Sequence, residues 1–190
     1  KEHIRKGIKF LCEKVEKADA KDMYVTDVRD TQLQSKIGPF VDTFFTTLVL
    51  AELKGKAGDD EKRLVAALDK TIDKIAKNQK EDGNFANNGG WAPTLSLGVC
   101  NKALSRARQN GAKVGDQLLA RAATQSSSSL KAAGPAAPAG GKAEPSADSF
   151  TGRGGAGLAG DAGVKLYSSS QGAGNLQDVL NVVKLDADKA

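Results

Sequence analysis

Residues 70–91, KTIDKIAKNQKEDGNFANNGGW, decide the fold. Their first half completes an apolar stripe at helical spacing and predicts a helix over residues 59–80. The stripe comprises Leu64, Leu68, Ile72 and Ile75. Gln79 stands near the end of this helix, and an Asp-Gly pair and then Phe85 follow it. The Gly- and Asn-rich remainder is expected to form a loop, because these residues favour turns.

Two other segments of the chain resemble the start of this stretch. KGIKFL at residues 6–11 and AGVKLY at residues 162–167 align with KTIDKI at residues 70–75. The first segment belongs to a predicted helix over residues 1–18, in which Ile4, Ile8, Leu11 and Val15 form one stripe. In the third segment, Gln171 stands where Gln79 stands in the second. The alignment indicates an internal repeat of helices that bury their apolar faces by stacking on neighbours.

Further helices are expected between and after these copies. Residues 42–54, with Asp42 as the cap, are apolar nearly all round, which predicts a helix buried on most sides. Residues 93–109 begin with Pro93, a residue favoured in a first helical turn, and a short helix is expected over residues 114–124. Residues 19–40 lack a sustained period and are expected to be a long loop. No segment alternates as a strand would, so the predicted fold class is all-α.

The composition divides the chain into three parts. Residues 1–124 are predicted to form helical-hairpin repeats. Residues 125–161 are rich in Ser, Ala, Gly and Pro, and such a segment buries too little apolar area to offset its ordering entropy, so a linker or disordered arm is expected. Residues 162–190 regain a helical pattern and are predicted to add a further repeat segment.

The repeat resembles the QW-type repeat of the squalene–hopene cyclase and protein prenyltransferase superfamily. The resemblance rests on Lys-Gly-x-x-Phe-Leu and on Gln-x-x-Asp-Gly-x-aromatic, which ends at Phe85. It implies stacked α-hairpins that form part of an α/α toroid, a double ring of helices. In this motif the Gln is expected to bond free helix carbonyls, the Gly to make the turn, and Phe85 to pack the turn onto the next hairpin. A closed ring needs more hairpins than this chain supplies. Either further hairpins of a longer protein or another chain is therefore expected to complete the arc.

The catalytic motifs of that superfamily are missing from the sequence. The string nearest to the cyclase acid motif Asp-x-Asp-Asp is DVRD at residues 27–30, where Arg29 replaces the central acid, so a solvated charged loop is expected there. His3 is the only histidine, and it shows no metal-ligand spacing with Cys12 or Cys100. Both cysteines fall on apolar stripes and are expected to be buried thiols, with one disulfide as the alternative. We therefore expect no cofactor and no metal, and the sequence favours a protein that is not an enzyme.

Charge and hydropathy exclude several classes of protein. Lys and Arg number 28 against 23 Asp and Glu, a net charge of +5, but the two signs alternate along the expected helices. Only 5% of residues are aromatic, so no stacking platform for nucleic acid is expected. No apolar run approaches the roughly 18 residues that a membrane-spanning helix needs, so no transmembrane segment is expected. The sequence does not indicate a compartment.

The residues expected to face a ligand lie where the two apolar helices begin. Helix N-termini carry partial positive charge, and in a toroid they would point to its mouth, which selects Asp42, Thr43 and Thr94. Trp91, in the preceding loop, is added because it would lie at the same mouth. The expected function is a non-catalytic module for scaffolding or protein interaction, its partner another protein or a second copy. The alternatives are a fragment of an isoprenoid-processing enzyme and a module that binds a hydrophobic ligand.

Overall fold

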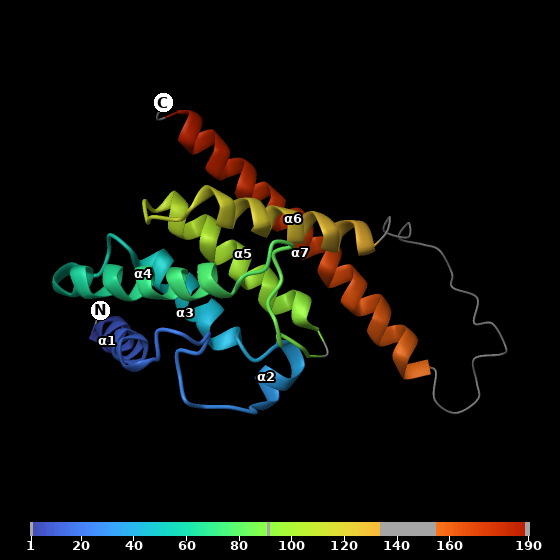
Figure 1. The fold of residues 1–190 in the computed structure, drawn as a ribbon, viewed down its shortest axis with the longest axis horizontal. Coiled ribbons are helices and arrows are strands. Elements are labelled where there is room, and N and C mark those ends of the chain that lie inside the picture. The colour runs from blue at the N-terminus through green and yellow to red at the C-terminus, as the bar shows by residue number, and fades with distance from the viewer. Residues whose placement is uncertain (1, 91, 134–154, 189–190) are drawn as a thin grey trace.

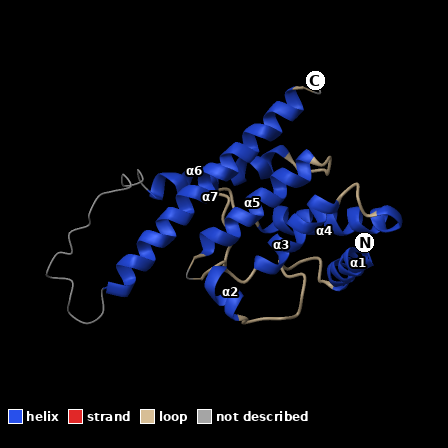
Figure 2. Ribbon diagram, turned by 180° about the vertical axis from the view of Figure 1, so that it is seen from behind, coloured by secondary structure: helices blue, strands red, loops and turns tan. Residues whose placement is uncertain are grey.

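The described chain is a bundle of helices joined by loops (Figures 1 and 2). The computed structural model describes residues 2–90, 92–133 and 155–188, and of residues 132, 133 and 155–169 it describes the backbone alone. The helices are α1 (Glu2–Lys17), α2 (Gln32–Ile37), α3 (Val41–Leu53), the 3₁₀ turn η1 (Gly58–Asp60), α4 (Glu61–Asn78), α5 (Pro93–Gln109), α6 (Asp116–Ala133) and α7 (Gly155–Ala187). Within these residues no strand occurs, and the only extended pairing is an isolated bridge between Gln79 and Phe85. The all-α prediction is confirmed.

The apolar stripes of the sequence become the core. All four stripe residues of α4 are buried. Ile8 and Val15 of α1, which contacts α4, belong to the same buried cluster. Ile4 of the α1 stripe is an exception, because it is 58% exposed near the start of that helix. The prediction that α3 is buried on most sides is also too strong, since Phe45 and Val49 are 44% and 38% exposed.

Two local predictions around α3 are wrong. Residues 19–40 are not all loop, because α2 forms within them behind a capping box in which Thr31 and Gln34 each bond the other's backbone. This Thr-x-x-Gln spacing is a helix-start signal that the longer apolar patterns obscured. Asp42 does not cap α3, whose N-cap residue is Phe40, without a side-chain hydrogen bond. Asp42 lies instead in the first turn of the helix.

The segment expected to be a linker begins with helix. α6 continues to Ala133, and its residues Gln125 and Ser126 are buried. The predicted end of this helix at residue 124 and the start of the linker at residue 125 are therefore wrong, and α7 already begins at Gly155. Tertiary contact explains the extension, since the Asn101 side chain of α5 donates hydrogen bonds to the Gln125 and Ser126 side chains. Residues 134–154 lie outside the described part of the chain.

Three helices form a row at the centre of the bundle. α3 packs against α5, and α5 packs against α7 (Figure 1). On the outside, α4 contacts α1 and α3, and α6 contacts α5 and α7. Two glycines permit the close approach of α7. A Cβ atom on Gly98 would lie 2.0 Å from the Gln171 side chain, and one on Gly172 would lie 3.0 Å from the Ser126 carbonyl oxygen.

Candidate functional site

The motif that ends α4 forms a rigid turn. Gln79 is the C-cap residue of α4. We expected its side chain to bond a free helix carbonyl, but its amide Nε2 donates instead to the Gly83 carbonyl in the turn, 3.3 Å away. Gly83 has a φ of +81°, and a Cβ atom there would lie 2.3 Å from the Arg121 carbonyl oxygen, so the turn requires glycine as expected. Phe85 is buried against Phe44, with ring centroids 5.1 Å apart. It therefore packs on α3, the helix before α4, rather than on the next hairpin.

The third copy of the repeat does not share this turn. Gln171 lies in the middle of α7, which continues to Ala187, so it ends no helix. Its side chain instead packs beside Gly98 of α5. The sequence similarity of residues 162–167 thus corresponds to a helix with a different local role.

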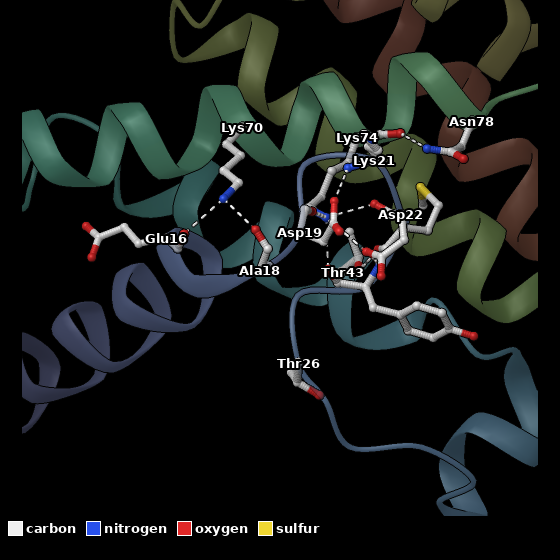
Figure 3. A network of polar contacts seen from close by, with 12 residues as sticks. Glu16, Ala18, Asp19, Lys21, Asp22, Thr26, Thr43, Lys70, Lys74 and Asn78 are labelled. Atoms are coloured by element: carbon white, nitrogen blue, oxygen red, sulfur yellow. Dashed lines mark hydrogen bonds and ion pairs between the residues drawn. The ribbon is translucent and has the colours of Figure 1, made fainter.

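A buried lysine on α4 fixes the loop that follows α1 (Figure 3). The side chain of Lys74 is 1% exposed, and its ammonium donates to the carbonyl oxygens of Asp22 and Tyr24 at 2.7 and 2.9 Å. It also donates to the Asp19 carbonyl and lies 3.2 Å from Asp22 Oδ1. A buried ammonium needs hydrogen-bond acceptors all round, and this loop supplies them from its backbone. The loop conformation and the burial of Lys74 therefore depend on each other.

Two further side chains anchor the same loop. Lys70, one turn before Lys74, donates to the carbonyls of Glu16 and Ala18 at 3.0 and 2.7 Å. These carbonyls lie at the end of α1, where they have no partner within the helix. From α3, the Thr43 hydroxyl donates to the Met23 carbonyl, and both residues are buried. Residues 18–24 are thus held from α3 and α4, and farther along the same loop Gln34 of α2 donates a hydrogen bond of 3.1 Å to the Val28 carbonyl.

The outer side of this loop borders two hollows, of about 330 and 220 Å³. Tyr24 and Arg29 line both, and the Arg29 guanidinium carbon lies 3.5 Å from the centroid of the Tyr24 ring. The larger hollow adds Lys14 and Lys17 of α1 and the acidic loop residues Asp19, Asp22 and Asp27. The smaller one adds Asp30, Gln34, Ser35, Pro39, Gly89 and Gly90. Both hollows therefore carry charges of both signs around one stacked cation–aromatic pair.

The four predicted ligand-facing residues do not form one group in the described structure. Asp42 accepts a hydrogen bond of 2.7 Å from Gln34 of α2, and Thr43 anchors the loop. Thr94 instead borders a separate gap of about 10 Å³ between α5, α6 and α7. Trp91 lies outside the described residues. Tyr24 and Arg29, which line both hollows, were not among the four predicted residues.

One feature of the sequence could have identified Lys74. It falls in register with Ala67 and Thr71, on the flank of the apolar stripe of α4, and all three residues are buried. A lysine on such a flank is a candidate for a buried cation that needs acceptors from a neighbouring segment.

The chemistry available to the described residues is limited. No group of three or more His, Cys, Asp and Glu side chains among them could hold a metal ion. Cys12 and Cys100 are free and buried, and burial raises the pKa of both thiols, which disfavours the reactive thiolate. Residues 27–30 form an exposed charged loop, as expected. Nor does any helix of the described chain have the length and apolar character needed to cross a bilayer.

Comparisons with known proteins give no match to a protein-family model, to a curated protein or to a solved structure.

Proposed function

We propose that this chain is a non-catalytic helical-repeat module, part of an α/α toroid, that binds another protein through the surface around Tyr24 and Arg29. The row α3–α5–α7, with α1, α4 and α6 outside it, supports the toroid part of the proposal, because outer and inner helices alternate along the chain. The buried thiols and the lack of a metal-binding group among the described residues favour binding over catalysis.

The observation that carries the proposal is the anchored loop of residues 18–31. A loop that is already fixed loses little conformational entropy when a partner binds it, and such preorganisation increases affinity. Lys70, Lys74 and Thr43 fix this loop from the inside. Its outer side and the adjoining α2 carry the groups that protein interfaces prefer, an arginine and a tyrosine beside exposed apolar side chains.

The apolar part of this surface is formed by Val28 and Leu33. Their side chains are 53% and 50% exposed, and both lie close in sequence to Arg29. A partner that covers them would gain the hydrophobic contribution of burial, while the hollows beside Tyr24 would accept its protruding side chains.

The test is affinity capture and cross-linking in an extract of the source cells, with partners identified by mass spectrometry. We expect a partner that is bound by the wild-type chain and lost with the double variant Arg29→Ala, Leu33→Asp. Ile4→Asp is the matched control, because Ile4 is similarly exposed, at 58%, and lies near the start of α1, about 15 Å along the helix from Lys14, which lines the larger hollow. The proposal would be refuted by a partner that binds the double variant as well as the wild type. Turnover of a prenyl diphosphate or squalene by the purified chain would also refute it.

A further inference from the structure

α7 has an apolar stripe that is largely exposed in the described chain. Leu176, Leu180, Val183 and Ala187 recur at spacings of four, three and four residues and lie on one face of the helix. Leu180 and Val183 are 55% and 59% exposed, Ala187 is exposed and Leu176 is half-buried. No charged residue falls within the stripe.

The other face of α7 is the one that packs on the bundle. Gly172, Asn175 and Val182 are buried there, and Gly172 lies close to Ser126 of α6. At the end of this face, Asp186 accepts a hydrogen bond of 2.8 Å from Arg108 of α5. The buried face of α7 is thus formed mainly by small and polar residues, and its apolar stripe lies on a separate, exposed face. An exposed apolar stripe of this kind marks a surface for interaction with another chain.

The row α3–α5–α7 is closed at its other end. Residues 18–31 cover α3 there, since Met23 and Val25 are 3% and 2% exposed and Thr43 of α3 bonds the Met23 carbonyl. Repeat arrays need a cap at each end, because an end helix otherwise exposes its apolar face. In the described chain, this array has a cap at α3 and an exposed stripe on α7, the helix at the other end of the row (Figure 1).

We infer that the occupant of the α7 stripe is the α7 helix of a second copy, antiparallel to the first and related to it by a two-fold axis near Leu180. Two copies that meet in this way form one continuous arc of paired helices, longer than either chain supplies alone, with residues 18–31 at each of its two ends. Head-to-tail association would need an uncovered α3 end, which the anchored loop occupies. The inference concerns a different surface from the proposed partner-binding site and does not depend on it.

The stripe is self-complementary about Leu180. In an antiparallel pair, Leu180 faces its own counterpart, Leu176 faces residues 183 and 184 of the second copy, and the two alanines at positions 173 and 187 face each other. Lys184 is the one charged residue on the flank of the stripe. It would lie about 12 Å along the axis from its counterpart, at a rise of 1.5 Å per residue, which exceeds the Debye length of about 8 Å. The pairing therefore creates no close like-charge contact.

The first test is sedimentation of the full chain over a range of concentrations. We expect a reversible dimer for the wild type and a monomer for Leu180→Glu with unchanged helicity and melting temperature, because Leu180 makes few contacts within its own chain. Phe10→Glu is the matched control, since its side chain is 57% exposed against 55% for Leu180, and it should stay dimeric. A wild-type chain that is monomeric up to about 100 μM, or a dimer that persists in Leu180→Glu, would overturn the inference.

The second test places a thiol on the proposed axis. Leu180→Cys should form a disulfide-linked dimer under mild oxidation, because the two side chains would face each other. Leu33→Cys, 50% exposed, is the control and should stay monomeric on a denaturing gel. The native thiols are buried and should not contribute. Equal cross-linking of both variants, or preferential binding of a foreign helix at Leu180 with no dimer, would exclude the two-fold pairing.

Discussion

Replacement of Lys74 by methionine tests the central contact of the candidate site. Methionine has nearly the same length and removes only the ammonium, so the packing of the side chain is retained. The wild-type ammonium serves three backbone carbonyls and one carboxylate oxygen. After the substitution the carbonyls of Asp19, Asp22 and Tyr24 lose this donor.

The magnitude follows from the burial of these groups. A buried acceptor left without its donor costs about 1–3 kcal/mol. The side chain of Asp22 is 48% exposed, so water can reach part of the loop, and the low end of that range applies. Three carbonyls then cost about 3 kcal/mol, a large share of a typical stability of about 5–15 kcal/mol. The half-exposed carboxylate of Asp22 recovers its hydration and adds little.

The assay is urea unfolding followed by circular dichroism, with hydrogen exchange to locate the effect. Lys74→Met should lower the free energy of unfolding by about 3 kcal/mol, against about 1 kcal/mol for Lys70→Met, whose two carbonyl contacts lie nearer the solvent. Amides of residues 19–28 should exchange faster in Lys74→Met, while those of α5 should change only through global unfolding. Equal losses for the two variants, or unchanged exchange in this loop, would show that the ammonium does not fix it.

Three further predictions concern the turn, a thiol and an ion pair. Gly83→Ala should destabilise the chain by about 3 kcal/mol in urea unfolding, because the new Cβ atom meets a backbone carbonyl, whereas Gly55→Ala, at a similar φ but in open space, should cost about 1 kcal/mol. The Cys100 thiol, whose pKa is raised by burial, should react with a disulfide reagent at pH 8 only as fast as the chain unfolds; faster reaction would place it in solvent. The hydrogen bond from Arg63 lowers the pKa of Glu16, so its stabilisation is present above the ordinary carboxyl pKa and is lost as pH falls through the lowered value. The difference in melting temperature between wild type and Glu16→Gln should therefore vanish in acid, and a difference that grows as the pH falls would reverse this assignment.

The sequence predicts the fold best where one apolar stripe decides the structure. In α4, the burial of Leu64, Leu68, Ile72 and Ile75 follows from their spacing alone, and Pro93 correctly marks the first turn of α5. An apolar stripe has a single helical period and marks a single buried face, so the local sequence is enough to predict both the helix and its buried side.

The prediction fails where a contact distant in sequence decides. The Ser-rich end of α6 is helical because Asn101 and the approach of Gly172 give it tertiary contacts that its composition does not reveal. The position of Lys74 on the flank of the stripe marks it as a candidate for burial, but its acceptors in residues 19–24 lie 50 to 55 positions away, and local sequence does not indicate them. Composition predicts the structure of an isolated segment, whereas tertiary contacts determine the structure of these two segments.

The two surfaces that we propose for binding also differ in this respect: one depends on contacts distant in sequence, and the other on a local apolar stripe. The loop of residues 18–31 uses a buried cation, Lys74, to hold an exposed surface in one conformation, so its apolar groups Met23 and Val25 point inward and close the array. Among the described residues α7 has no comparable cover, and its exposed stripe repeats the helical period as regularly as a core stripe does. The described array is closed at one end by its own loop, and the pairing that we infer would cover its other end with a second α7.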